Sequence, residues 1–372
     1  MRTAAIALTL VTCGGGGAPP VATVTATRDL GPLAFVPSVR GRDGGYSAGW
    51  AGRSVWDFGD TVLSSAATDG ETWRSSTFCT TTDLDATDNL APLDEPLDAA
   101  GAPGEFLPFT ADEQAFNDAH FSNKIRATCT DDCGARWALW PGPVVPDPAG
   151  GGALVFYAKV SARPGPYNFD FVGTSVATWA SPDARPVRPA LRPDAAEPTL
   201  LFDGDEPNLA AAALTVGDQL YAYACSGAGF SAPCVLARAP WARATERAAW
   251  TFLGADDQWT TDARAAKTVL DGATMMTVAW NEALGAYAAI YSAPASSDLL
   301  FRTAPAPEGP WSDAQLLLHA MRPTNPDAWT YSGLAHAELA RDDGLTQVVS
   351  YFRETGFLAG ELRLVEVTLA KR

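Results

Sequence analysis

The chain has 372 residues, 47% of them hydrophobic and 19% charged, which excludes a disordered tail and a coiled coil. Its 26 basic and 43 acidic residues give a net charge of −17, so a nucleic acid is an unfavourable partner. Twelve Trp residues, against three His and four Met, point to an all-β protein with aromatic surfaces.

The first residues have the pattern of an export signal. Arg2 precedes an apolar run shorter than the roughly 20 residues that a membrane span needs, and residues 1–12 are expected to be a signal peptide. Residues 10–13 (Leu-Val-Thr-Cys) resemble a lipobox, in which Cys13 becomes the lipidated N-terminus. The Gly- and Pro-rich stretch from residue 13 to residue 35 is expected to be a tether. The alternative is an ordinary cleaved signal with an incidental Cys13, and both readings predict an exported protein.

Strand signals recur along the rest of the chain as short β-branched and aromatic runs bounded by Gly, Pro, Asn or Asp. The best helical stretch begins at Thr110, which has capping-box spacing to Glu113, and another short helix is expected at residues 242–249. The expected strands are residues 54–58, 153–160, 173–179, 209–214, 220–224, 275–280, 287–291, 299–303, 346–352 and 362–369.

These strands group into units of about 55–70 residues with similar joints, at residues 239–241 and 304–312. Radially arranged four-stranded blades leave an all-β chain with only short, protected edges. We therefore expect one five-bladed β-propeller over residues 36–372, acting as a monomer. A pair of β-sandwiches is the alternative, with residues 181–198 as the linker.

Export makes disulfides permissible. Cys225 and Cys234 lie at facing ends of two expected strands, and we expect them to form a disulfide. Cys129 and Cys133 can close a small loop, or Cys79 can pair with one of them. A zinc site at Cys129 and Cys133 lacks a second Cys or His pair.

The densest chemical signal is a pair of carboxylates near the start. Asp43 is expected in a tight turn with Gly44 and Gly45, and Asp60 at the end of a strand whose hairpin partner begins at Tyr46. On the inner strands of a propeller, both would face the central funnel. Two carboxylates there can supply the acid and the nucleophile or base of glycoside cleavage. The alternative is that they only bind turn amides.

Residues 41–47 (Gly-Arg-Asp-Gly-Gly-Tyr-Ser) and 54–61 (Ser-Val-Trp-Asp-Phe-Gly-Asp-Thr) resemble the opening of the family called domain of unknown function 4185. Residues 136–142, 280–281, 309–312 and 331–339 agree with it. The resemblance implies a five-bladed propeller and, since some members are endo-D-arabinanases of glycoside hydrolase family 183, an endo-acting glycanase. The paired aspartates of the family fall on Asp43 and Asp60. The chain departs from the family in acidic, Pro-rich inserts near residues 83–108 and 185–198, so the resemblance does not identify the sugar of the substrate.

Other polar and aromatic residues are candidates for binding the glycan. His336 and Glu338 are two apart in an expected extended segment and would share one face, with Glu338 as a third carboxylate or a blade-edge ion pair as the alternative. The further candidates are Arg42, Tyr46, Trp140, Asn208 and Asn281. Turn capping is the alternative for the two Asn residues, and inter-blade core for most Trp residues.

The sequence predicts no cofactor. No phosphate-binding loop and no Gly-x-Ser-x-Gly elbow occurs, and a structural Ca²⁺ near Asp131–Asp132 or Asp256–Asp257 stays open. The predicted function is an exported glycoside hydrolase whose partner is a polysaccharide or oligosaccharide. The alternative is a non-catalytic surface lipoprotein that binds glycan or protein in the same funnel.

Overall fold

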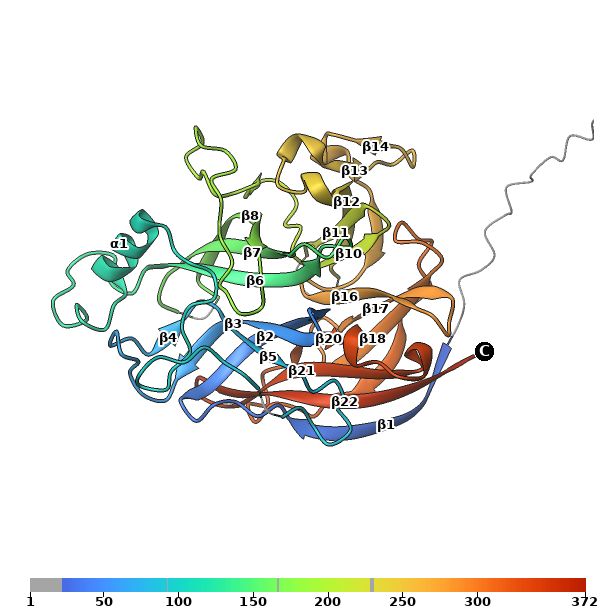
Figure 1. Cartoon of the computed structure of the whole chain (residues 1–372), viewed down its shortest axis with the longest axis horizontal. Helices are drawn as coiled ribbons and strands as arrows, with labels where there is room; N and C mark the ends of the chain where they lie inside the picture. The colour runs from blue at the N-terminus through green and yellow to red at the C-terminus, as the bar shows by residue number, and fades with distance from the viewer. Residues whose placement is uncertain (1–21, 92, 166, 228–230) are drawn as a thin grey trace, which may run out of the picture.

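The structure, a computed structural model, describes residues 22–91, 93–165, 167–227 and 231–372. The expected signal peptide and Cys13 lie outside these residues. Five antiparallel sheets are arranged as a five-bladed β-propeller (Figure 1), and the predicted fold class is confirmed.

Each blade is one sheet, and the blades follow one another along the chain. Blade 1 has β2 (Val39–Trp50), β3 (Arg53–Leu63), β4 (Trp73–Arg74) and β5 (Thr77–Thr81). Blade 2 has β6 (Arg136–Pro146), β7 (Ala153–Ala162), β8 (Phe169–Trp179) and β9 (Phe202–Asp203). Blade 3 has β10 (Ala212–Val216), β11 (Gln219–Cys225), β12 (Pro233–Pro240), β13 (Thr251–Leu253), β14 (Trp259–Thr260) and β15 (Thr268–Asp271). Blade 4 has β16 (Met276–Asn281), β17 (Ala286–Ser292), β18 (Asp298–Ala304) and β19 (Gln315–His319).

Blade 5 joins the two ends of the chain. Its strands are β20 (Tyr331–Ala335), β21 (Thr346–Gly356), β22 (Ala359–Lys371) and β1 (Ala22–Pro32), in that order. β1 pairs with β22 along its whole length, from Ala22 opposite Lys371 to Pro32 opposite Arg363. The expected tether boundary at residue 35 is therefore wrong for residues 22–32, which form a propeller strand.

The hydrophobic cores lie between neighbouring blades. Between blades 1 and 5, Trp56 and Phe58 pack with Val348 and Leu364, all fully buried. Equivalent clusters fill the other four interfaces. Since truncating a buried aromatic side chain costs about 3–5 kcal/mol, these interfaces hold the blades as one body.

Helical structure is limited to connections. α1 (Ala111–His120) begins after Thr110, and the predicted capping box with Glu113 is present. α1 lies outside the ring beside β6 (Figure 1). The helix expected at residues 242–249 is instead two short 3₁₀ turns, η1 (Trp241–Arg243) and η2 (Arg247–Ala249). The remaining 3₁₀ turns are η3 (Ala263–Ala265), η4 (Ala337–Leu339) and η5 (Asp342–Gly344).

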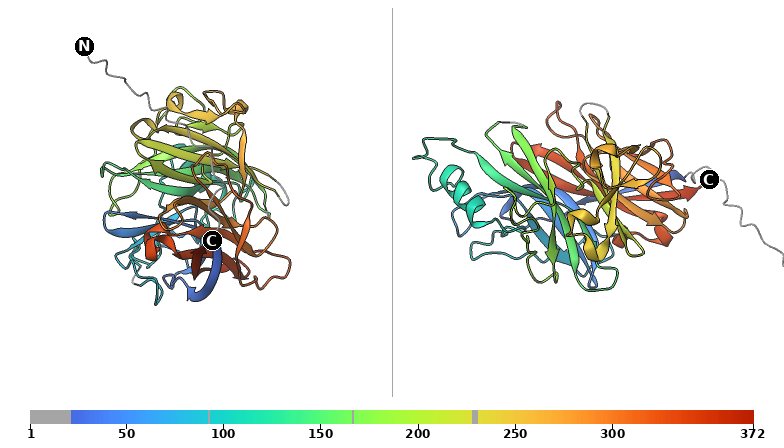
Figure 2. Two further views of the ribbon diagram at one scale, coloured as in Figure 1. Left: turned by 90° about the vertical axis from the view of Figure 1, so that its right-hand side faces the viewer. Right: turned by 90° about the horizontal axis from the view of Figure 1, so that it is seen from above.

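The innermost strands β2, β6, β10, β16 and β20 surround the central channel and all run in the same direction. They contact one another around the ring, and Figure 2 shows the blades from two further directions. We call the end of the channel at which these five strands begin the carboxylate face, because Asp43 lies near the beginning of β2. The other end is called the opposite face.

Two disulfides are present in the described part of the chain. Cys225 and Cys234 are direct partners in the β11–β12 pair and are bonded, as predicted. Cys129 is bonded to Cys133, and Cys79 is a buried free thiol, which decides between the two pairings left open. Among the described residues, no helix has the length and apolar character needed to cross a membrane.

Candidate active site

Asp43 and Asp60 lie on adjacent strands of blade 1. Asp43 is within β2, at a bulge where Gly44 and Gly45 have φ of 85° and 93°, a conformation that favours glycine. The sequence predicted a tight turn there, but the strand continues through Asp43. Asp60 is inside β3 rather than at its end.

The strand register brings the two carboxylates together. Arg42 pairs with Thr61 and Gly44 with Phe58, so Asp43 lies opposite Gly59 and Asp60. The glycine at position 59 allows the Asp43 side chain to lie against β3, because a Cβ added there would lie 2.6 Å from Asp43 Oδ1. The predicted pairing of Asp43 with Asp60 is thus present in the geometry.

Asp43 is held in an environment that favours its protonated form. Burial, and next the negative charge of Asp60, raise the pKa of Asp43 to about 7. The hydroxyl of Tyr331 donates to Asp43 Oδ2 at 3.0 Å and opposes this shift. No Arg or Lys of the described residues forms an ion pair with Asp43.

Asp60 has a cation and an indole as neighbours instead. Trp140 Nε1 donates to Asp60 Oδ1 at 3.2 Å, and an Arg136 guanidinium nitrogen is 3.8 Å from Oδ2. Burial raises the pKa of Asp60, while Arg136 and the Trp140 and Trp73 side chains oppose that rise. Because 29% of the Asp60 side chain is exposed, the carboxylate is accessible from solvent.

Aromatic rings flank the two carboxylates on the carboxylate face. On the side of Asp60, the Arg136 guanidinium lies over Trp73 at 4.7 Å from the ring centroid. On the side of Asp43, the Tyr331 ring packs on Phe352 at 4.8 Å. Tyr331 is 41% exposed, so this aromatic surface is open to a ligand. Three further rings continue it: Phe121 beside Trp73, and Phe169 and Phe171 beside Trp140.

Sequence reasoning missed Tyr331, Arg136 and Trp73 as site residues. Tyr331 and Arg136 are the first residues of β20 and β6, and both begin motifs that resemble the family. The available signal was therefore positional: the first residues of all inner strands meet at the carboxylate face, where Asp43 also lies.

His336 and Glu338 do not join the carboxylate pair. The expected extended segment is instead the start of η4, with His336 as its N-cap. Both side chains meet at Ser47, whose Oγ lies 2.6 Å from His336 Nδ1 and 2.6 Å from Glu338 Oε1. Ser47 is four positions beyond Asp43 on β2, roughly 13 Å along a strand, toward the opposite face.

A cavity of about 210 Å³ occupies this second half of the channel. Ser47 and Glu338 line it together with apolar residues of the inner strands, such as Val144, Met276 and Val278. Neither Asp43 nor Asp60 is among its lining residues. The structure thus separates the predicted candidates into two groups at different depths of the channel.

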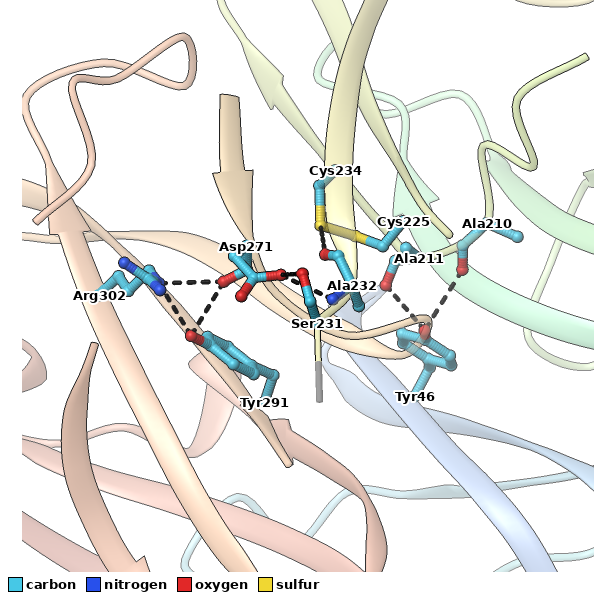
Figure 3. Close-up of a disulfide and its surroundings, with 10 residues drawn as sticks. All are labelled: Tyr46, Ala210, Ala211, Cys225, Ser231, Ala232, Cys234, Asp271, Tyr291 and Arg302. Atoms are coloured by element: carbon cyan, nitrogen blue, oxygen red, sulfur yellow. Dashed lines mark hydrogen bonds between the residues drawn. A yellow bond between two sulfur atoms is a disulfide. The ribbon is translucent and has the colours of Figure 1, made fainter. Parts of the chain in front are cut away.

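Two candidates in the motif around Asp43 make structural contacts. Both side chains of the Arg42–Glu95 ion pair are fully buried, and the two nitrogen–oxygen distances are 2.8 and 2.9 Å. Tyr46 is buried, and its hydroxyl donates to the carbonyl oxygen of Ala211 at 2.8 Å (Figure 3). The expected substrate contact of Arg42 is corrected here, because its side chain is fully buried in the ion pair. Tyr46 lines the cavity described above, so its contact with a substrate stays a prediction.

The two Asn candidates also serve the local backbone or a neighbour. Asn281 is buried at the end of β16 on the opposite face, where it accepts from the Leu284 N–H and donates to the Gly344 carbonyl. This corrects its expected substrate contact in favour of turn capping. Asn208 lies on the connection into β10 and accepts from Thr174 Oγ1 at 2.7 Å.

The described residues contain no group of three or more His, Cys, Asp or Glu side chains placed to hold a metal ion. Asp257 instead pairs with Lys267, and Asp256 accepts from the Gln258 N–H. The described residues therefore offer no ligand cluster that supports a Ca²⁺ site.

The fold and site define the class: a five-bladed β-propeller with a pair of carboxylates at one end of its channel. The family model described as "Domain of unknown function (DUF4185)" matches residues 175–355, from β8 to β21, which confirms the resemblance over that segment. Asp43 and Asp60 lie outside the matched segment. No curated protein matches the chain.

Several solved structures align with this chain over most of its length. A candidate hydrolase from Bacteroides ovatus ATCC 8483 aligns with a TM-score of 0.59 and 16% identity, over 89% of this chain and 87% of that chain. A thermostable family-43 glycoside hydrolase gives a TM-score of 0.43 and 13% identity, over 91% and 92%. An α-L-arabinofuranosidase from Podospora anserina, solved with cellotriose, gives 0.45 and 11%, over 91% and 94%. The likeness to the Bacteroides ovatus protein is a likeness of fold alone.

Proposed function

We propose that this protein is an exported, endo-acting glycoside hydrolase, which cleaves internal bonds of an arabinan-like or related polysaccharide. The observation that carries the proposal is the placement of Asp43 and Asp60 side by side in unlike environments. Glycoside cleavage uses two carboxyl groups, of which one must be protonated and the other ionised at the same pH.

The environments favour one assignment of roles. Asp43 has a raised pKa and, among the described residues, no cationic partner, so it is the general acid that gives its proton to the leaving glycosidic oxygen. Asp60 is supported in its ionised form by Arg136 and Trp140, so it attacks the anomeric carbon or takes a proton from an attacking water. In both routes water becomes the hydroxyl of the new reducing end.

The surroundings fit a carbohydrate. Sugar rings present C–H faces that pack on aromatic rings, and Trp73, Trp140 and Tyr331 flank the carboxylates. The arabinan-like substrate rests on the resemblance of residues 41–47 and 54–61 to the family that includes endo-D-arabinanases. Two disulfides suit an oxidising compartment, in agreement with export, and we place the monomer at the cell envelope through Cys13 or in the medium.

The direct test is to incubate the purified protein with a panel of cell-wall and plant polysaccharides that includes D-arabinan and L-arabinan. We expect new reducing ends and shorter oligosaccharides from an arabinan-like polymer, and a much slower release of both with Asp43→Asn or Asp60→Asn. Binding without release of reducing ends would instead support a non-catalytic glycan-binding protein.

A further inference from the structure

Tyr331 is the one described side chain that donates a hydrogen bond to the carboxyl group of Asp43, and it comes from a different blade. Its hydroxyl is 3.0 Å from Asp43 Oδ2, although the two residues are 288 positions apart in the sequence. Burial, and next the charge of Asp43, raise the pKa of Tyr331 well above its usual range, so the phenol keeps the proton that it donates to Asp43.

The other oxygen of Asp43 is fixed from the opposite strand. Asp43 Oδ1 lies against Gly59, where any side chain would place a Cβ at 2.6 Å. Tyr331 itself is held by ring packing on Phe352 of β21. The plane of the Asp43 carboxyl group is thus set by blade 5 on one oxygen and by Gly59 on the other.

From these contacts we infer that Tyr331 is a positioning residue for acid catalysis, which orients Asp43 and stabilises the negative charge that Asp43 gains as it gives up its proton. The inference rests on the proposed function, and it deepens it by naming the group that acts on the acid. A hydrogen bond from an O–H to a carboxylate is stronger than one to a neutral carboxyl group, so the contribution of Tyr331 grows along the reaction.

This role predicts a dependence on the leaving group that a structural role does not. A glycoside with a good leaving group, such as a 4-nitrophenol, needs little protonation, whereas an unactivated sugar or phenol needs the full proton transfer. Removing the Tyr331 hydroxyl should therefore slow the second kind of substrate much more than the first.

The test compares Tyr331→Phe, which keeps the ring on Phe352, with Tyr167→Phe as the matched control. Tyr167 is 93% exposed and close enough to Tyr331 to influence its pKa, so this control removes a phenol hydroxyl in the same neighbourhood. The probes are an arabinan and two aryl arabino-oligosaccharides, one with 4-nitrophenol and one with phenol as the leaving group. We expect Tyr331→Phe to lower kcat about 10- to 100-fold on the arabinan and the phenyl substrate, with KM and the 4-nitrophenyl rate near wild type. Tyr167→Phe should resemble wild type on all three.

Equal losses on all substrates, or a Tyr331→Phe variant that behaves like Tyr167→Phe, would overturn the inference. A second readout needs no activity: carbon-13 NMR of the Asp43 carboxyl group, identified by its absence in Asp43→Asn. Because Tyr331 lowers the pKa of Asp43, its removal should shift that titration to higher pH. An unchanged titration would overturn the inference even if no glycan is cleaved, whereas a shifted titration in a protein that cleaves nothing would reject only the proposed function.

Discussion

Arg42 and Glu95 form a fully buried ion pair directly beside Asp43. The Arg42 guanidinium is also stacked 3.7 Å from the centroid of the Phe58 ring, on the strand that carries Asp60. Glu95 belongs to the acidic, Pro-rich insert at residues 83–108. Through this ion pair the insert supports β2, the strand that carries Asp43.

We expect Arg42→Met to destabilise the protein by about 3–5 kcal/mol, because it leaves the Glu95 carboxylate buried without its partner. The double variant Arg42→Met with Glu95→Met should recover a large part of that loss. Urea unfolding followed by circular dichroism measures both. If Arg42→Met is as stable as wild type and its KM is raised, the substrate contact predicted from the sequence for Arg42 would be supported instead.

Asp43→Asn and Asp60→Asn should each lower kcat about 100- to 10,000-fold without unfolding the protein, because each removes an ionisable group that takes part in bond cleavage. Asp183→Asn is the matched control, since Asp183 is exposed and forms a surface ion pair with Arg53. Initial rates of reducing-end release, with thermal melts of each variant, are the measurements. If both site variants keep the rate of Asp183→Asn, the catalytic assignment is wrong.

The pH dependence of activity should follow Asp43. The acid must be protonated, and its pKa is raised to about 7, so kcat/KM should fall about tenfold per pH unit above that value. A pH profile from 4 to 9 tests this, with circular dichroism at each pH to exclude unfolding. Constant activity up to pH 9 would contradict Asp43 as the acid.

The buried His336 should make the fold sensitive to acid. Burial lowers its pKa from 6.5 to about 3, so between these values the unfolded chain binds a proton that the folded chain does not. Stability is then lost as pH falls below about 6.5, by roughly 3 kcal/mol at pH 4 from this residue. His336→Gln should lose correspondingly less stability than wild type between pH 7 and pH 4. His319→Gln, at an exposed site, is the control and should lose as much as wild type.

The Cys225–Cys234 disulfide should contribute about 2–3 kcal/mol by restricting the unfolded chain. Replacing both Cys with Ser and measuring urea unfolding checks the magnitude. Peptide mapping without reduction checks the bond, and separate alkylated peptides containing Cys225 and Cys234 would contradict it. Cys79 is buried and should react with an alkylating reagent only after unfolding.

The propeller could be predicted because each blade repeats the same local pattern of strands and turns. The joints were misplaced, since residues 239–241 and 304–312 begin at the last residues of a blade's third strand rather than closing the blade. β1 was missed because most of its residues are exposed and its pairing depends on β22, at the other end of the chain.

The carboxylate pair could be predicted because Asp43 and Asp60 are close in sequence and lie on one hairpin. Their partners could not, since contacts such as Tyr331 with Asp43 depend on how blades meet around the ring. For the same reason the ion pair of Arg42 could not be predicted, since its partner Glu95 lies 53 positions away in the insert. His336 and Glu338 were expected in one extended segment, but Glu338 lies in a 3₁₀ turn, which has no clear sequence signal.

The pairing of β1 with β22 makes closure of the ring the last pairing step along the chain. Thr23 bonds to Ala370, 347 positions later, so β1 has no partner strand in the fifth blade until β22 has been synthesised. The strands of the first four blades all precede β22 and can pair on a growing chain. Until β22 is available the blades form an open arc, and the strand that is made first waits longest for its partner.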